Sequence, residues 1–178
     1  FFKHRMRDKI PLAHPIVPHR NATMKENSGL DPYNKGAYVL HMLRYLIGGD
    51  ALAGILKEFL SMEKKLPHNQ ATTQDFIDLV HLRTSMDLNW FFKVYLYETA
   101  LPVLNKNISH GSNHTFIEFH WENPDFKMPL EVKYSSNTGP RTKKLSLTNN
   151  PVIIPVAQYS DVKIDPMNWI LLTISDSQ

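Results

Sequence analysis

Apolar side chains follow two different periods along this chain, and the change falls near residue 103. Before that point they recur every three or four residues, which is the spacing that places them on one face of an α-helix. After it they alternate with polar residues, as in β-strands that have one buried face. The pattern therefore predicts an α+β chain with a helical part at residues 1–103 and a β-sandwich-like module at residues 104–178.

Four helices are expected in the first part, and each starts at a residue that suits an N-cap. Asp31 precedes Pro32, and proline fits the first helical position because its missing N–H costs nothing there. Thr72 is followed three residues later by Asp75, which predicts a capping box. The four expected N-caps are Asp31, Asp50, Thr72 and Asp87, and Gly48-Gly49 is expected to end the first helix. The apolar stripe expected for that first helix comprises Gly36, Val39, Leu40, Leu43, Leu46 and Ile47.

Short strands are expected in the second part, separated by turn-forming pairs such as Asn123-Pro124 and Asn149-Asn150-Pro151. Their number and spacing are typical of a small antiparallel sandwich or barrel. The expected strands are 116–121, 130–134, 143–147, 152–156, 162–164 and 169–173.

Composition narrows the possible functions only slightly. The chain has a net charge of +3 and a pI near 9.0, but its Lys and Arg residues are scattered, which favours a mildly basic protein over one that binds nucleic acid. The absence of cysteine excludes disulfides, thiolate catalysis and cysteine-based metal sites. No apolar run is long enough for a membrane span, and no leader is recognisable after Phe1, so we expect an internal fragment of a longer protein and make no prediction of its compartment.

The segment from Asp31 to Arg44 is the part of the sequence that is most informative about function. Taken alone, it is a capped amphipathic helix with Tyr33 in its first turn, and such a tyrosine ordinarily packs and makes a hydrogen bond. Its motif Tyr-x-Lys-Gly-Ala, followed by an apolar helix with Met-Leu-Arg, resembles the segment downstream of the zinc site in the gluzincin zinc aminopeptidases. That family includes aminopeptidase N and the leukotriene hydrolase.

Further segments resemble the same family in the same order. Residues 71–76 are similar to its Thr-Thr-x-Asp-Phe helix start, and residues 87–102 to its Asp-Leu-x-Trp-Phe-Phe…Trp-Leu-Tyr…Gly-x-Pro run. Tyr95 and Ala100 depart mildly from that run. Residues 162–171 resemble the end of the family's β-module. The resemblance covers nearly the whole chain and implies a helical C-terminal section of a thermolysin-like catalytic domain, followed by a small antiparallel β-sandwich-like module.

The resemblance also implies a catalytic role for Tyr33. In this family a zinc-bound water attacks the scissile carbonyl, a glutamate acts as general base, and a tyrosine faces the developing oxyanion. A phenol is protonated at neutral pH and can donate a hydrogen bond to that oxygen. Lys35 and Gly36 belong to the motif but are expected to serve structure, with Gly36 allowing close helix packing and Lys35 only solvated.

The family's zinc motif, His-Glu-x-x-His, does not occur in this sequence, and neither does its Gly-x-Met-Glu-Asn segment. In the family both precede the tyrosine. Zinc is therefore expected in the intact parent enzyme, which would cleave N-terminal residues from peptides, and not in this chain. The expected partners are peptide substrates and the upstream catalytic part of the same protein, with no nucleic acid.

Two alternatives remain open from the sequence. His110, His114 and His120 are close enough in sequence to suggest a metal site, although no carboxylate or cysteine has diagnostic spacing around them. The whole chain is also compatible with a non-catalytic helical-plus-β interaction module that keeps the family fold without its chemistry.

Overall fold

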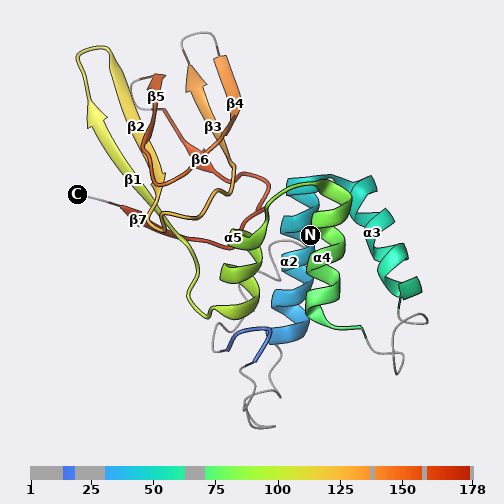
Figure 1. The fold of residues 1–178 in the computed structure, drawn as a ribbon. Coiled ribbons are helices and arrows are strands. Elements are labelled where there is room, and N and C mark those ends of the chain that lie inside the picture. The colour runs from blue at the N-terminus through green and yellow to red at the C-terminus, as the bar shows by residue number, and fades with distance from the viewer. Residues whose placement is uncertain (1–13, 19–30, 63–70, 137–138, 158–159, 177–178) are drawn as a thin grey trace. The chain divides into compact units, whose positions relative to one another are not determined.

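A computed structural model describes residues 14–18, 31–62, 71–136, 139–157 and 160–176 (Figure 1). The polypeptide divides into two compact units, Phe1–Thr99 and Ala100–Gln178. The first is helical and the second consists of β-strands, so the predicted α+β class is confirmed.

The helical unit contains the four expected helices. They are α2 (Asp31–Ile47), α3 (Gly49–Met62), α4 (Thr73–Thr84) and α5 (Asn89–Phe92), and α5 continues into a π-helical turn, η3 (Lys93–Tyr97). No helix in the described ranges is long and apolar enough to cross a membrane.

A left-handed glycine ends α2, as expected. Gly48 has φ +90°, a conformation that glycine adopts without steric cost, and its N–H donates to the Arg44 carbonyl at 2.9 Å. The chain enters α3 directly at Gly49, so Asp50 lies inside the first turn and the prediction that it is the N-cap is wrong. The polar residues expected at the end of this helix, from Glu63 onward, lie outside the described residues.

The capping box at α4 is confirmed. Thr72 Oγ1 accepts from the Asp75 N–H at 3.2 Å, and the Thr72 N–H donates to Asp75 Oδ2 at 2.8 Å. At the other end Ser85 has φ 54° and its N–H donates to the His81 carbonyl at 2.8 Å. Both ends of α4 are thus set by contacts within a few residues of sequence.

The start of α5 differs from the prediction by one residue. Leu88, not Asp87, occupies the N-cap position, and it makes no side-chain capping bond. Asp87 still accepts a hydrogen bond at Oδ1 from the Asn89 N–H at 3.1 Å. Leu88 is 1% exposed, so burial of its side chain in the core of the unit determines where the helix begins.

Aromatic rings in contact, most of them edge-to-face, pack the helices of this unit together. Phe76 of α4 lies with its ring centroid 5.2 Å from that of Phe59 in α3 and 6.4 Å from that of Phe92 in α5. Phe91 lies 5.3 Å from Phe92 and 5.1 Å from Tyr95. Rings at these distances contribute beyond their buried area, which explains why the short α5 is well packed.

The β unit has two sheets. A four-stranded sheet has the order β5-β2-β1-β7, and a three-stranded sheet has the order β4-β3-β6. The strands are β1 (Val103–His110), β2 (His114–Trp121), β3 (Leu130–Ser136), β4 (Gly139–Leu145), β5 (Val152–Ala157), β6 (Lys163–Ile164) and β7 (Thr173–Asp176). Every pair is antiparallel except β1 with β7, which is parallel. The antiparallel prediction is therefore wrong for that one pair.

Alternation along β2 builds the core of this unit. Thr115, Ile117, Phe119 and Trp121 are buried, and the residues between them are exposed or half-buried. The Trp121 indole N–H donates to the Met128 carbonyl at 2.8 Å, which satisfies its one polar atom inside the core.

Two segments of the β unit contradict the predicted strands. β1 was not predicted, because only Leu104 along it is buried and the strand shows no alternation. Residues 169–172 are not a strand although Ile170, Leu171 and Leu172 are buried. There the buried Asp165 carboxylate accepts from the N–H groups of Trp169 at 2.8 Å and Ile170 at 2.9 Å, so the backbone needs no strand partner.

The capping box generates a prediction about stability and pH. The side-chain and backbone hydrogen bonds from Thr72 lower the pKa of Asp75 below its ordinary value. Its stabilising effect is therefore complete above the ordinary aspartate pKa near 4 and is lost as the pH falls through the lowered value. We expect Asp75→Asn to remove this acid-dependent part of the free energy of unfolding, measured by denaturant unfolding at a series of pH values.

At neutral pH, Thr72→Ala should lower the free energy of unfolding by about 1 kcal/mol, because α4 loses its N-cap. Thr73→Ala, one residue later and also exposed, is the matched control and should have a much smaller effect. Equal losses in the two variants would contradict the assigned cap.

Candidate functional site

Tyr33 lies in the first turn of α2, and its side chain is 78% exposed. Packing in the core of the unit, the ordinary role of such a tyrosine, does not account for this position. Its ring and hydroxyl are accessible to a ligand, while its backbone belongs to a helix of 17 residues.

Lys35, two residues further on, is fully buried. Its Nζ donates to the Glu98 backbone carbonyl at 2.8 Å, across 63 residues of sequence. The expectation that Lys35 is merely solvated is therefore wrong. Burying an ammonium without hydrogen-bond partners is very costly, and this bond offsets part of that cost.

The buried face of α2 differs from the apolar stripe that the sequence predicts. The buried residues are Lys35, Tyr38, Val39, Met42 and Leu43, whereas Leu40, Leu46 and Ile47 are only half-buried. Lys35, Val39 and Met42 stand at positions i, i+4 and i+7 of one helical face. That spacing indicates burial of Lys35, but an apolar stripe does not include it because its side chain is charged.

Gly36 does not serve the close packing expected of it. A Cβ placed on it would meet no described atom within 4 Å. Gly36 instead lines a cavity of about 350 Å³ in the helical unit, whose walls include Val17, Val39, Leu40, Phe59, Phe76 and Leu96. The Val17 N–H donates to the Leu96 carbonyl at 2.9 Å and so ties one wall to η3.

Helical geometry relates these three residues. Residues three apart are neighbours on a helix surface, so Tyr33 stands next to Gly36 on α2, although Tyr33 is not among the described residues that line the cavity. Lys35 lies two residues from Tyr33, roughly 200° around the helix, and points into the core. The first turn of α2 is thus anchored through Lys35 and presents the exposed phenol of Tyr33 on another side of the helix.

The described part of the chain contains no group of three or more His, Cys, Asp or Glu side chains that could hold a metal ion. His110 Nδ1 lies 3.2 Å from Thr115 Oγ1, and His120 Nε2 lies 3.3 Å from Asn105 Nδ2. His114 lies at the start of β2. The three histidines are therefore not brought together, and the donors in the described ranges do not fit a zinc ion.

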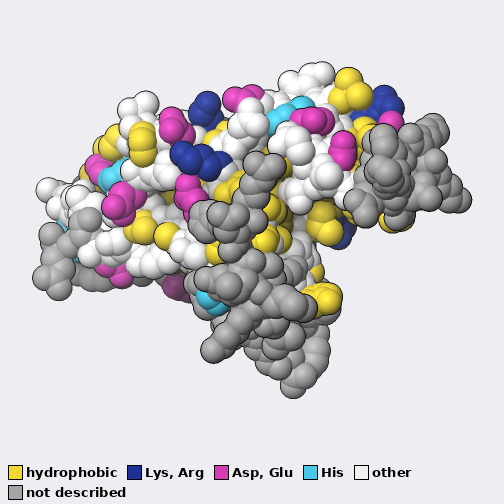
Figure 2. Space-filling model, turned by 60° about the horizontal axis from the view of Figure 1, so that its bottom comes forward, with side chains coloured by type: hydrophobic (Ala, Val, Ile, Leu, Met, Phe, Trp, Pro, Cys, Tyr) yellow, Lys and Arg dark blue, Asp and Glu magenta, His cyan; other side chains and the backbone are white. Residues whose placement is uncertain are grey.

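Surface charges are mixed on the face that Figure 2 shows, where Lys and Arg side chains lie among Asp and Glu. The two signs also pair in ion pairs such as Lys106 with Asp176 at 2.7 Å. A nucleic-acid-binding surface usually has basic residues gathered in one patch or stripe, and this face has no such patch.

Comparison with known proteins finds similarity to this chain in sequence and in fold. No family model matches the chain. The sequence is 23% identical over 152 residues to aminopeptidase N of Haemophilus influenzae, a match that covers 85% of this chain and 16% of that protein. The fold is similar to that of Legionella pneumophila aminopeptidase A in complex with aspartic acid, with a TM-score of 0.64 over 88% of this chain and 19% of that one, at 12% identity. The chain thus spans less than a fifth of either relative.

The buried lysine generates a prediction. Lys35→Met keeps an unbranched apolar stem but leaves the Glu98 carbonyl without this donor, so the free energy of unfolding should fall by about 1–3 kcal/mol. Urea unfolding followed by far-ultraviolet circular dichroism measures the loss of helix.

Lys57→Met is the matched control, because Lys57 is an exposed lysine of α3. Its effect should stay within about 0.5 kcal/mol. If both variants lose the same stability, or neither loses any, the anchoring role of Lys35 is wrong.

Proposed function

We propose that this chain is the C-terminal part of a zinc metalloaminopeptidase that removes N-terminal residues from peptides, and that Tyr33 is the residue that faces the oxyanion. The similarity to two aminopeptidases supports this proposal, as do the family motifs that occur in the same order along the chain. The observation that carries it is the exposed phenol of Tyr33 on a helical turn anchored by the buried Lys35.

The chemistry of Tyr33 in this proposal is hydrogen-bond donation. When a nucleophile adds to a peptide carbonyl, negative charge develops on the carbonyl oxygen. A neutral phenol donates its proton into a hydrogen bond with that oxygen without transferring it, and such a donor lowers the barrier by roughly 3–4 kcal/mol. The donor must be held in place before the charge develops, and a backbone fixed in the first turn of α2 meets that requirement.

The proposed parent enzyme holds its zinc ion and general base in the part of the protein upstream of the tyrosine motif. The described residues offer no group that fits the metal, so we assign to this chain no step of metal chemistry. Its contribution is the oxyanion donor and the turn that orients it. The partners of the proposed enzyme are its peptide substrates and, for this chain, the upstream catalytic part.

Substitution of Tyr33 in the full-length protein tests the proposed role. Tyr33→Phe removes only the hydroxyl, so turnover of an aminoacyl substrate should fall by about two to three orders of magnitude while zinc content stays the same. Tyr97→Phe, which alters another exposed tyrosine of the helical unit, is the matched control and should retain full turnover. Unchanged turnover in Tyr33→Phe would exclude the oxyanion role.

The 178-residue chain alone should neither bind stoichiometric zinc nor hydrolyse aminoacyl substrates, because it lacks the His-Glu-x-x-His motif. Metal analysis of the purified chain and an aminopeptidase assay test this directly, and zinc together with turnover would refute it. The upstream reading frame distinguishes the enzyme from a non-catalytic interaction module, since only the enzyme requires that motif there.

A further inference from the structure

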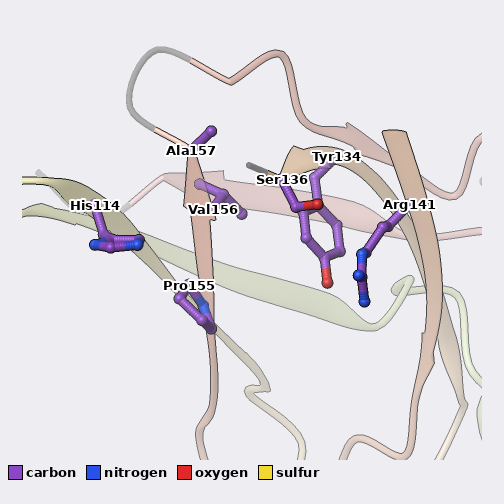
Figure 3. Close-up of a pocket in the computed structure, with 7 residues that line it drawn as sticks. All are labelled: His114, Tyr134, Ser136, Arg141, Pro155, Val156 and Ala157. Atoms are coloured by element: carbon purple, nitrogen blue, oxygen red, sulfur yellow. The ribbon is translucent and has the colours of Figure 1, made fainter. Parts of the chain in front are cut away.

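The β unit contains a cleft of about 290 Å³ that has no part in the proposed peptidase chemistry. Its lining comes from four strands: His114 of β2, Tyr134 and Ser136 of β3, Arg141 of β4, and residues 155–157 of β5. Figure 3 shows the Tyr134 ring and the Arg141 side chain side by side, with the hydroxyl and the guanidinium pointing the same way.

Strand register explains why these two side chains are neighbours. Tyr134 and Arg141 are directly opposite each other in the β3–β4 pair, so their side chains project from the same face of the sheet. Two residues along, the same face carries Val132 opposite Lys143, and then the buried pair of Leu130 and Leu145. This face therefore changes from an apolar core to a cationic, phenolic surface towards the hairpin.

An apolar wall completes the cleft. β3 and β5 contact each other, and Val156 of β5, which is 2% exposed, lines the cleft together with Pro155 and Ala157. The Ser136 hydroxyl already donates to the Gly139 carbonyl at 2.9 Å, so it braces the hairpin and is not a donor for a ligand. The donors that project at this end are the Arg141 guanidinium and the Tyr134 hydroxyl (Figure 3).

The positive charge of the residues at the cleft favours an anionic ligand. None of the residues that line the cleft is Asp or Glu, and Lys143 adds a second positive charge on the same face as Arg141. A guanidinium carries five N–H donors in a planar fork that matches a carboxylate, and two of them suffice for a bidentate bond. A phenol beside it supplies a third donor to the same group.

The strands that border the cleft favour a peptide as the carrier of that carboxylate. Among the described strands, β5 and β4 each lie at the edge of their sheet. An edge strand offers unpaired backbone N–H and C=O groups to an extended segment. Pro155 removes one N–H from β5, which limits long strand addition but leaves room for a short contact.

We propose that this cleft binds the carboxylate of a short peptide through the Arg141 guanidinium and the Tyr134 hydroxyl, with an aliphatic neighbour of the carboxylate packed on Pro155 and Ala157. The carboxylate belongs either to an acidic side chain or to the peptide's C-terminus, and the chemistry is the same. This proposal stands on the geometry of the β unit alone and does not depend on the peptidase assignment.

Three peptides of equal length distinguish the two sources in an NMR titration of the isotope-labelled 178-residue chain. They are acetyl-Ala-Glu-Val-amide, its Gln twin, and the Gln twin with a free C-terminal carboxylate. We expect saturable shifts at the Arg141 side-chain N–H and the Val156 amide with at least one of the two peptides that carry a carboxylate, and none with the neutral twin. The peptide that binds more tightly identifies the source.

Substitutions test the donors. Arg141→Gln should weaken binding about tenfold or more, and Tyr134→Phe by a smaller factor, because a hydrogen bond to a charged group is stronger from the charged donor. Lys144→Gln is the matched control, since Lys144 is an exposed cation on the opposite face of β4, across from Glu131. The affinity of this variant for the peptide should change less than about twofold.

Thermal unfolding of each variant checks that the β unit is intact. Arg141→Lys keeps the positive charge but removes the planar guanidinium, so it tests separately whether the guanidinium fork is required. Each of three results would overturn the proposal: that the neutral twin binds as tightly as the carboxylate peptides, that Arg141→Gln binds them like the unaltered chain, or that inorganic phosphate binds as tightly as either peptide.

Discussion

One hydrogen bond, from the Lys35 ammonium to the Glu98 carbonyl, meets two requirements of the helical unit at once. A buried ammonium must have acceptors, and the carbonyls at the end of a helix have no partner within the helix. Glu98 is the C-cap of η3, where the negative end of the helix dipole favours a cation. The bond therefore joins the first turn of α2 to the end of η3 across 63 residues.

This anchor determines what the other face of α2 can do. With Lys35 held in the core, Tyr33, roughly 200° around the helix, is exposed to solvent. A side chain that must meet a reacting atom gains from such a backbone, because the position is fixed by packing elsewhere and not by the ligand. The same motif thus contains a structural residue and a candidate functional one, separated by a single position.

Elements specified by contacts within a few residues were predictable, and those that depend on distant partners were not. The caps of α4 and the glycine end of α2 could be recognised because Thr72, Asp75 and Gly48 act locally. β1 was missed because it forms by pairing with β2 and β7, with little burial of its own. The apolar run after Asp165 predicts a strand, because the sequence pattern does not show that the Asp165 carboxylate satisfies the backbone there.

The candidate sites follow the same distinction. The role proposed for Tyr33 comes from a family resemblance, because no local pattern separates a catalytic tyrosine from a packed one. Burial of Lys35 was visible in the helical spacing but was obscured by its charge. Tyr134 and Arg141 lie next to each other because of the register of β3 with β4, and alternation within either strand does not specify that register.

The parallel pairing of β7 with β1 bears on how the protein is made. Residues 103–106 of β1 pair with residues 173–176 of β7, the two ends of the β unit. Pairing across such a separation is slow, because a long loop must close before any contact forms. During synthesis β2 can pair with β1, and β5 with β2, before β7 is made, so one edge of β1 stays open until residues 173–176 leave the ribosome. The four-stranded sheet is therefore complete only after β7 has been synthesised.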